Sequence, residues 1–512
     1  MLSTVTILLV LSAFASVLSA EEFRFSSYYG NHMVLQKAPA KAFVWGYGQT
    51  GAKVVVSLSG ANKEEQISAK SAVINGIWRA ALKPVEAGGP YNLTASQSIT
   101  NSSITLTDVL FGDTWLCSGQ SNMAFTVGQV INATEELALA SKYTNVRIFQ
   151  AALEKSEEEL TDLARVEVPW SRPTAKLLGG KAFTHFSAVC WLFGRYLYET
   201  LKYPIGLVHS SWGGTPVEAW SSPRALHKCG LMNSQFLVKS NFWENASTKW
   251  NSSVLWNAMI HPLLNMTITG AIWYQGEANA NYNRDKYNCS FPVMIDDWRM
   301  AFHKGSGGQT ALHFPFGFVQ LSTYHKSDSQ DGFREIRWHQ TADYGFAPNK
   351  RMKNTFMAVA IDVPDERSPW GSIHPEDKED VAYRLVLGAR AVAYGEKNVS
   401  FQGPFPTQAM LKQDFISIVF DQGINAIPDD GFFFEVCCSE DKTCESDNKW
   451  LPVPIEKCGF DYVLVSKPKC DADIIGVRYL WTDWPCNFKA CPIYSSDGLL
   501  PAPPFILSIT NQ

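Results

Sequence analysis

The sequence predicts an α/β protein in which a parallel sheet with helices on both faces is flanked by two β-sandwich-like regions. Between residues 106 and 395, short apolar runs end in Gly- or Ser-rich turns and alternate with amphipathic helical segments. Strands that are apolar throughout and alternate with helices are typical of a parallel sheet buried on both faces. Residues 21–105 and 396–512 instead alternate apolar and polar positions in short runs, which favours antiparallel sandwiches.

The first 20 residues differ from the rest of the chain. They hold an apolar run that ends in small residues before Glu21, and this pattern predicts a signal peptide at 1–20. The run is shorter than the roughly 20 residues that span a bilayer, and no other stretch is long and apolar enough, so we expect no transmembrane anchor. The remaining chain is then divided into an N-terminal β-sandwich domain at 21–105, a central domain at 106–395 and a cysteine-rich β domain at 396–512.

The composition excludes several classes of protein. Apolar residues make up 46% of the chain and charged residues 18%, which is normal for a globular protein and excludes extended disorder. The formal net charge of −5 provides no field that would attract nucleic acid or an anionic membrane surface. We therefore expect neither as a partner, and the sequence does not determine the oligomeric state.

Cysteines and glycosylation signals both indicate the secretory pathway. Eleven cysteines are present, seven of them between residues 437 and 491, and none has the CxxC spacing of a zinc site, so we expect disulfides. Because the total is odd, at least one thiol stays unpaired, and Cys117 in an apolar strand is our candidate for it. Eight Asn-x-Ser/Thr signals occur, at Asn92, Asn101, Asn132, Asn245, Asn251, Asn265, Asn288 and Asn398.

The elements of the central domain follow from its apolar pattern. Strands are predicted at 109–111 with 115–117, and at 205–208, 268–274, 316–321 and 356–361. Amphipathic helices are predicted at 187–201 and 377–394. Ligands of such sheets bind beyond the carboxyl ends of the strands, and every motif considered below lies at such an end.

Four motifs carry residues suited to ester hydrolysis. In chain order they are GQSNM at 119–123, WGGTPVEAW at 212–220, WYQGEAN at 273–279 and IHP at 373–375. Ser121 is the candidate nucleophile and His374 the candidate base, because a serine hydroxyl needs a base to take its proton. Donors for the oxyanion are expected from the backbone N–H of Ser121, from the backbone at Gly213 or Gly214, and from the side-chain amide of Asn279.

Each motif also has a simpler structural interpretation when it is taken alone. A serine that follows a Gly-led turn is common, and Asn279 could be a turn residue. His339 is the main alternative to His374 as the base. It is the presence of all four motifs that favours a hydrolase. No HxxxH or HExxH spacing is present, so we expect neither a metal nor another cofactor.

The order Ser, Gly, Asn and His resembles the SGNH (GDSL-like) hydrolase superfamily. The strings SGQSNM, WGGTPVEAW, WYQGEANA and SIHP are similar to its sialate O-acetylesterase branch, and so are HMVLQ near the N-terminus, IRWHQTADYG and the cysteine-rich C-terminal region. The resemblance covers nearly the whole mature chain. It implies a flavodoxin-type parallel sheet and a lysosomal or secreted serine esterase. Such an enzyme removes O-acetyl groups from sialic acids or sialoglycoconjugates, at the 9-position especially, through an acyl-serine intermediate.

The chain departs from the superfamily at the acid that orients the histidine. Many members carry Asp three residues before the catalytic His, where this chain has Gly371 before His374. We expect Asp365 to take the role, with Asp362 and Glu277 as possible alternatives. A Ser–His dyad without an acid is the other interpretation.

Residues that recognise the substrate are harder to choose from the sequence. A sialic acid carries a carboxylate, which an arginine binds with two hydrogen bonds, and Arg337 is our candidate, with Arg334 beside it. Gln275, in the third motif, is a second candidate for substrate contact. Trp212 or Trp273 could form a wall of the pocket, or either could simply be core.

Two other functions compete with sialate deacetylation. The first is deacetylation of another acetylated glycan, such as xylan, by the same chemistry. The second is a catalytically inactive glycan-binding ectodomain on the same scaffold. The presence of Ser121, Gly213, Gly214, Asn279 and His374 together argues against an inactive protein.

Overall fold

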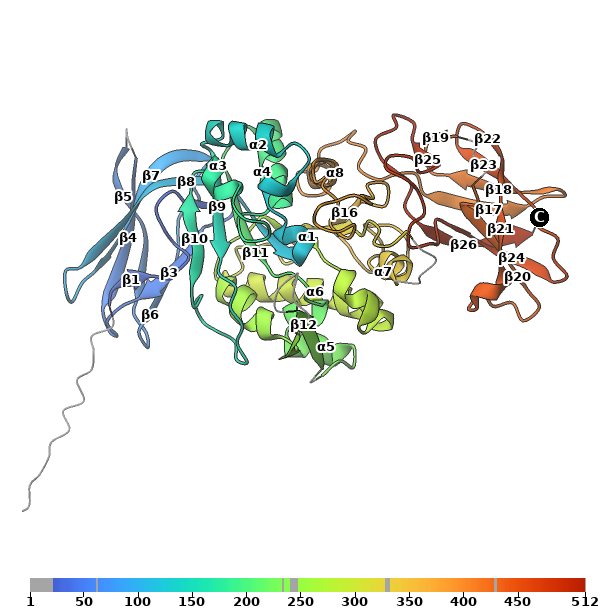
Figure 1. Cartoon of the computed structure of the whole chain (residues 1–512). Helices are drawn as coiled ribbons and strands as arrows, with labels where there is room; N and C mark the ends of the chain where they lie inside the picture. Colours follow the sequence, from blue (N-terminus) through green and yellow to red (C-terminus); the bar gives the residue numbers. More distant parts are fainter. Residues whose placement is uncertain are drawn as a thin grey trace, which may run out of the picture.

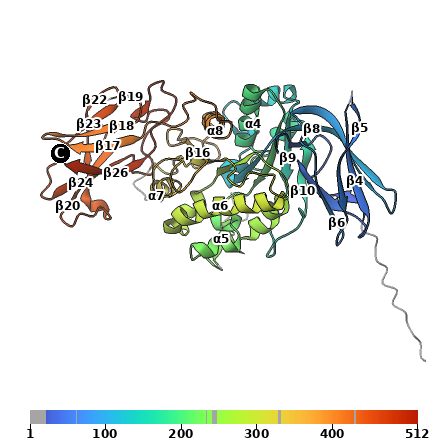
Figure 2. The same ribbon diagram turned by 180° about the vertical axis from the view of Figure 1, so that it is seen from behind.

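The computed structural model describes residues 22–60, 63–232, 234–239, 247–326, 332–427 and 431–511. The predicted signal peptide at 1–20 lies outside them. A β-rich N-terminal region, a central α/β region and a β-rich C-terminal region follow one another along the molecule (Figure 1). The view from behind shows the same order, with the central region between the other two (Figure 2). Within the described ranges, no helix combines the length and apolar character needed to cross a membrane.

Two groups of strands form the N-terminal region. One is the antiparallel sheet β1-β3-β6, and the other contains β4, β5 and β7, which pair with the first part of β8. Trp45 and Trp78 from the first group, and Val54 and Val56 from the second, are fully buried in one core. The strands are β1 (Arg24–Phe25), β2 (Val34–Gln36), β3 (Phe43–Tyr47), β4 (Lys53–Gly60), β5 (Lys63–Ala72), β6 (Ile77–Ala81) and β7 (Gly88–Gln97).

Strand β8 (Ser103–Gly119) joins the N-terminal region to the central sheet. Its first part pairs antiparallel with β7, and from Asp113 to Gly119 it pairs parallel with β11. Burial changes along the strand in the same way, from partly exposed positions to a run that is buried throughout. The boundary that the sequence predicts at 105/106 therefore falls within one continuous strand, and the two predicted segments at 109–111 and 115–117 belong to it.

The central sheet has the strand order β10-β9-β11-β8-β14-β15-β16. All neighbours pair parallel except β10, which is antiparallel to β9 at one edge, so the sheet is mixed. Every residue of β11, β14, β15 and β16 is buried, which accounts for their continuous apolar character. The strands are β9 (Val146–Ala151), β10 (Val166–Ser171), β11 (Ile205–Ser211), β14 (Gly270–Tyr274), β15 (Phe316–Gln320) and β16 (Thr355–Val359).

Helices cover the central sheet. Figure 1 shows α4 and α8 on one side of it, with α5 and α6 on the other. Helix α4 begins where the sequence predicts a helix, because the hydroxyl of Ser187 caps it by accepting from the N–H of Cys190. The helices are α1 (Ser121–Ala124), α2 (Ala133–Leu139), α3 (Ala175–Leu178), α4 (Ala188–Leu201), α5 (Pro223–Lys228), α6 (Tyr287–Gly305), α7 (Phe333–His339) and α8 (Glu379–Val392).

The C-terminal region is a single curled sheet rather than the predicted sandwich. Its eight strands follow the order β21-β20-β24-β26-β17-β18-β23-β22, and the two edge strands are separated in the chain only by Pro454. The sheet is thus bent into a nearly closed, barrel-like form. The strands are β17 (Pro406–Leu411), β18 (Phe415–Phe420), β20 (Phe434–Ser439), β21 (Trp450–Val453), β22 (Ile455–Cys458), β23 (Tyr462–Ser466), β24 (Asp473–Tyr479) and β26 (Phe505–Asn511).

Two small two-stranded sheets complete the set of described sheets. They are the hairpin β12 (Gln235–Lys239) with β13 (Ser247–Asn251), and β19 (Ile424–Ala426) with β25 (Ile493–Ser495).

Five disulfides are formed, and one of them corrects the prediction of a free Cys117. That residue is bonded to Cys190, which ties β8 to the start of α4. The free thiol is Cys458 at the end of β22. The two cysteines are 73 residues apart, so nothing in the local sequence indicates their pairing. The other bonds are Cys229–Cys289, Cys437–Cys444, Cys438–Cys470 and Cys486–Cys491.

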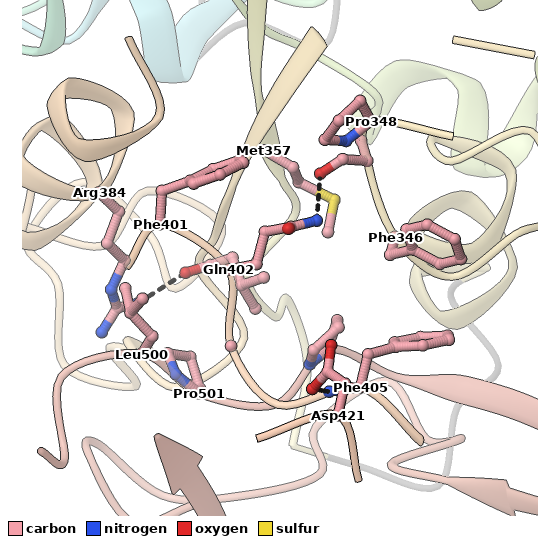
Figure 3. Close-up of a pocket in the computed structure, with 14 residues that line it drawn as sticks. Phe346, Pro348, Met357, Arg384, Phe401, Gln402, Phe405, Asp421, Leu500 and Pro501 are labelled. Carbon is pink, nitrogen blue, oxygen red and sulfur yellow. Dashed lines mark hydrogen bonds between the residues drawn. The ribbon is translucent and has the colours of Figure 1, made fainter. Parts of the chain in front are cut away.

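A cavity of about 160 Å³ lies between the central and C-terminal regions. Figure 3 shows Phe346, Met357 and Phe405 around it. Its polar groups are bonded to the protein: Gln402 Nε2 donates to the carbonyl of Ala347 at 2.9 Å, and the N–H of Phe405 donates to an Asp421 carboxylate oxygen at 3.0 Å. The cavity therefore lies at a joint between the two regions where most lining residues are apolar but Arg384, Gln402 and Asp421 also contribute.

Candidate active site

The turn after β8 places Ser121 at the end of the central sheet. Gly119 has φ of +141°, and a Cβ atom there would lie 2.1 Å from the carbonyl oxygen of Tyr274, so only glycine fits between the two strands. The N–H of Gln120 then donates to the same carbonyl at 3.0 Å. The chain turns directly into α1, whose first residue is Ser121.

Ser121 and His374, which are 253 residues apart in the chain, are in direct contact. The Oγ atom of Ser121 lies 2.8 Å from Nε2 of His374. On the other side of the ring, Nδ1 lies 2.9 Å from the backbone carbonyl oxygen of Trp370. A carbonyl can only accept, so Nδ1 carries the proton and Nε2 is left to accept from the serine hydroxyl. This is the tautomer that a general base needs.

The carbonyl of Trp370 takes the position that the sequence analysis assigned to an acid. The carboxylate of Asp365 accepts from the backbone N–H groups of Arg367 and Glu376, at 3.2 and 3.3 Å. Asp362 is also placed elsewhere, since its two oxygens bind the guanidinium of Arg384 at 2.6 and 2.9 Å. The sequence carries no signal for this contact, because every residue has the same backbone carbonyl.

Aromatic side chains enclose the imidazole. The ring of Phe183 meets it edge-on at 5.0 Å between centroids, and the ring of Phe125 stacks on it at 6.4 Å. Burial, helped by the nearby positive charge of Lys378, lowers the pKa of His374 to about 4, although the hydrogen bond to Trp370 acts in the opposite direction. The imidazole is therefore neutral, and able to accept a proton, down to acidic pH.

This enclosure leads to a prediction on pH dependence. Because the neutral imidazole is the active form, we expect kcat/KM to fall only as the pH drops through about 4. In Phe183→Ala, water reaches the ring more easily, so the pKa of His374 should rise toward its ordinary value and move the acid limb upward by about one pH unit. Phe401→Ala, at the cavity of Figure 3, is the control and should keep the wild-type profile. Identical profiles for all three proteins would contradict the proposed cause.

The backbone at Gly213 comes close to Ser121. β11 ends beside β8, and the N–H of Trp212 donates to the carbonyl of Gly119 at 3.0 Å. A Cβ atom on Gly213 would lie 3.3 Å from Cβ of Ser121, and Gly214 has φ of +72°. The structure thus brings Gly213 to the nucleophile, while the nearest atom to a Cβ on Gly214 would belong to Val238. A backbone N–H close to the nucleophile is suited to stabilise a developing oxyanion.

Asn279 and Gln275 are bonded inside the protein. The amide nitrogen of Asn279 has two hydrogens, and both have acceptors: an oxygen of Glu218 at 2.9 Å and the carbonyl of Tyr282 at 3.0 Å. Gln275 donates to Asn279 Oδ1 at 2.8 Å and accepts from the hydroxyl of Tyr287 at 2.9 Å. Both side chains are fully buried. They connect the loops after β11 and β14, in place of the predicted contacts to oxyanion and substrate.

The predicted substrate arginine is also internal. Arg337 is fully buried and donates to the carbonyls of Ser322 and Thr482, so it joins the central and C-terminal regions. Arg334 contributes to the same junction through its ion pair with Asp447 at 2.8 Å. The prediction was wrong because the sequence does not show that these residues face the C-terminal sheet.

The positions of His339, Trp273 and Trp212 in the structure distinguish between the alternatives that the sequence left open. His339 pairs with the carboxylate of Asp343 at 2.6 Å. Trp273 is a fully buried core residue that packs on Trp298. Trp212 is half-buried and packs edge-on against Trp250 at 4.8 Å, next in the chain to Gly213. Of the two tryptophans, Trp212 is therefore the one suited to form a wall of the site.

Three buried polar side chains lie beside the Ser–His pair: Asn122, Glu277 and Lys378. Of these, only Glu277 was a candidate from the sequence. Asn122 Nδ2 donates to Glu277 Oε1 at 2.6 Å, and Lys378 Nζ donates to Asn122 Oδ1 at 2.7 Å. Burial raises the pKa of Glu277 and lowers that of Lys378 to about 7. Asn122 could have been suspected from its place next to Ser121, and Lys378 from its place four residues after His374.

Most of the glycosylation signals that are described lie at the surface. Asn92, Asn101, Asn132, Asn251 and Asn398 are exposed, Asn265 and Asn288 are half-buried, and Asn245 lies outside the described residues. Within the described part of the chain, no three His, Cys, Asp or Glu side chains are grouped so that they could hold a metal ion.

Comparison with known proteins agrees with this site. The family described as "Carbohydrate esterase, sialic acid-specific acetylesterase" matches residues 112–368, and "Sialate O-acetylesterase C-terminal domain" matches 407–509. A solved carbohydrate acetylesterase from Xanthomonas citri superposes with a TM-score of 0.74 at 27% identity, covering 94% of this chain and 99% of that one. Fold and site together therefore define a carbohydrate esterase.

Curated relatives narrow this class to one family. The sialate O-acetylesterase of Mus musculus is 50% identical over 96% of this chain and 95% of its own length. That of Homo sapiens is also 50% identical, over 96% of this chain and 93% of its own length. The chain belongs to the sialate O-acetylesterase family.

Proposed function

We propose that this enzyme removes O-acetyl groups from sialic acids, at the 9-position especially, with Ser121 as nucleophile and His374 as general base. The observation that carries the proposal is the 2.8 Å contact between Ser121 Oγ and His374 Nε2, together with the Trp370 carbonyl that fixes the tautomer. The family supplies the substrate class, since its relatives are named as sialate O-acetylesterases.

Acylation begins when Nε2 of His374 takes the hydroxyl proton of Ser121 and Oγ attacks the acetyl carbonyl carbon. The carbonyl oxygen becomes an oxyanion, and we expect the backbone N–H groups of Gly213, which lies close to Ser121, and of Ser121 at the start of α1 to stabilise it. The tetrahedral intermediate then breaks its bond to the sugar oxygen, which takes the proton from His374 and leaves as an alcohol. Acetyl-Ser121 remains.

Deacylation repeats these steps with water. His374 takes a proton from a water molecule, the hydroxide attacks the acetyl carbon, and the second intermediate collapses to acetate while Ser121 recovers its proton. No carboxylate takes part in this scheme. The imidazolium that forms in each step is stabilised by the Trp370 carbonyl that holds its Nδ1–H.

We also propose that the central sheet has a flavodoxin-type fold. Five parallel strands of the central sheet, taken as β11-β8-β14-β15-β16, occur in the order 2-1-3-4-5 along the chain. That is the flavodoxin-type order, which supports an SGNH-like hydrolase domain in which β9 and β10 extend one edge. In such sheets the ligand binds beyond the carboxyl ends of the strands, where Ser121 and Gly213 lie.

We also propose a lysosomal or secreted location. It is supported by the apolar segment at 1–20, by the disulfides and by the lowered pKa of His374, which keeps the base active in an acidic compartment. The pH profile described above tests the lysosomal part. An acid limb near pH 6.5 in the wild-type enzyme would contradict it.

The substrate is tested by measuring acetate release from 9-O-acetylated sialic acid and from acetylated xylan. We expect release from the sialic acid at a kcat/KM at least about 100-fold above that for xylan, a difference of roughly 2.7 kcal/mol in transition-state binding. Preferred release from xylan would keep the esterase and reject the sialate assignment. No release from either, by folded protein, would favour a glycan-binding role without catalysis.

A further inference from the structure

We propose that Asn122 and Lys378, held by Glu277, form a clamp that positions His374 against Ser121. The term clamp refers to these three side chains throughout. The inference rests on the proposed function and deepens it, because it names residues on which the reaction depends although none of them reacts. Asn122 and Lys378 are thus positioning residues rather than catalytic ones.

The clamp forms hydrogen bonds with the backbone on both sides of His374. Asn122 Nδ2 donates to the carbonyl of Ile373, the preceding residue, at 2.9 Å. Lys378 Nζ donates to the carbonyl of Pro375, the following residue, at 2.7 Å. The two side chains are themselves joined by the 2.7 Å bond from Lys378 Nζ to Asn122 Oδ1. Since Asn122 directly follows Ser121 in α1, the base and the nucleophile are tied to one another through three hydrogen bonds.

Glu277 fixes the orientation of the amide. Its Oε1 accepts from Asn122 Nδ2 at 2.6 Å, so the nitrogen of Asn122 must face Glu277 and Ile373 while its oxygen faces Lys378. Glu277 comes from the loop after β14, which adds the neighbouring strand of the sheet to the group. All polar contacts of the Asn122 side chain are thereby made inside the protein, as a buried polar network requires.

Burial argues that the lysine has a specific role. Lys378 is fully buried, and Asn122 and Glu277 are 2% and 5% exposed. A buried ammonium group is costly unless it is paired and hydrogen-bonded. Lys378 meets this requirement with its two bonds and with the ring faces of Phe125 and Tyr274, 4.7 and 5.3 Å from Nζ. An apolar side chain at position 378 would need no hydrogen bonds to offset its burial, but it could not join Asn122 to the carbonyl of Pro375.

The site needs such a device because Nδ1 of the imidazole is bonded to a backbone carbonyl of its own loop. In a Ser-His-Asp triad, a carboxylate fixes the ring and stabilises its charge. Here the ring is bonded to Trp370, which belongs to the same loop as His374, so that contact cannot set the distance between the loop and α1. The clamp connects the two. A displacement of about 1 Å between reacting groups can reduce the rate about 100-fold.

The test compares Lys378→Met, Asn122→Ala and the double variant. We expect each to lower kcat about 100-fold while KM changes less than about twofold, because positioning rather than substrate binding is lost. The double variant should be no slower than the slower single variant, since both changes open the same clamp. Lys378→Arg, which keeps charge and donors, should retain more activity than Lys378→Met. Inactivation by a fluorophosphonate that labels the serine should slow in parallel with kcat.

Arg195→Met is the matched control for loss of a buried cation. Arg195 is 8% exposed and binds Glu136 at 2.6 Å, on the outer helices. It should lower the melting temperature but leave kcat of the folded enzyme unchanged. Wild-type kcat in folded Lys378→Met and Asn122→Ala, or a double variant whose loss is the product of the single losses, would overturn the clamp. Asn122→Ala adds no atoms, so it keeps the test open if a lysine variant does not fold.

The outcome is separate from that of the proposed function. If Ser121→Ala abolishes acetate release while the clamp variants are normal, only the clamp fails. If Ser121→Ala keeps its activity, the assignment of the nucleophile fails, and the clamp with it.

Discussion

Replacing Ser121 by alanine is expected to lower kcat for acetate release on the order of 10⁶-fold, as loss of the nucleophile does in other serine hydrolases. The change removes the atom that attacks the acetyl carbon and that lies 2.8 Å from Nε2 of His374. Because a short helix begins at this residue and its side chain caps nothing, the fold should be unaffected. The measurement is acetate release from 9-O-acetylated sialic acid, with a melting curve to verify folding.

Ser118→Ala provides the control for that experiment. Ser118 lies three residues earlier in β8, is fully buried, and its hydroxyl has no hydrogen-bond partner among the described residues. Its removal should leave kcat within a few-fold of the wild type. Residual activity of Ser121→Ala above about 1% of wild type would reject Ser121 as the nucleophile. A stoichiometric acetyl adduct that mass spectrometry locates on another residue would reject it as well.

Replacing His374 by alanine is expected to be nearly as severe, with kcat reduced on the order of 10⁶-fold. The base that takes the serine proton is lost, and so is the group that returns a proton to the leaving sugar oxygen. Unlike the wild type, the variant should show no acid limb near pH 4 in its residual rate, because the group that titrates there is gone. Steady-state kinetics over a range that extends at least one pH unit below this limb and up to neutral pH would measure both effects.

His339→Ala separates the two histidines that the sequence left in competition. His339, at the end of α7, lies 2.6 Å from Asp343, so its loss should remove a hydrogen bond without touching the Ser121 hydroxyl. We expect kcat within about threefold of wild type, and a somewhat lower melting temperature. A large loss in His339→Ala together with an active His374→Ala would reverse the assignment.

The geometry also explains how the enzyme can lack the usual acid. The Asp position three residues before the base is Gly371, which has φ of +87° and whose carbonyl accepts from the N–H of His374 at 2.8 Å. This tight turn brings the carbonyl of Trp370 under Nδ1. A neutral acceptor stabilises an imidazolium less than a carboxylate does, which agrees with a base whose pKa is low.

Much of the central sheet could be predicted from the chain. The segments 205–208 and 316–321 lie in β11 and β15, where every residue is buried, so apolar character alone identified them. Strand β9 (Val146–Ala151) was missed, because Arg147, its second residue, argues against a buried strand. Arg147 is nevertheless 2% exposed, and it is compensated by the carbonyl of His32 at 2.8 Å and by Asp108 at 2.9 Å. Those partners are distant in the chain.

The residues of the candidate site were likewise predicted only in part from the sequence. Ser121, Gly213 and His374 were chosen from motifs at strand ends, and the structure brings all three together. Asn279 and Arg337 were chosen from the same kind of reasoning, and they face inward instead. Residue type shows what a side chain can do. It does not show whether its hydrogen bonds are already taken.

The sequence by itself determined most strands of the central sheet and the nucleophile and base to consider, because these depend on side-chain chemistry and on local spacing. Its motifs also resemble the family to which the chain belongs. Only the tertiary structure decided that a backbone carbonyl holds His374, that Cys117 pairs with Cys190, and that Lys378 reaches Asn122. The physical reason is that backbone acceptors are alike at every residue. Contacts between groups up to 256 residues apart exist only once packing has brought them within hydrogen-bond distance.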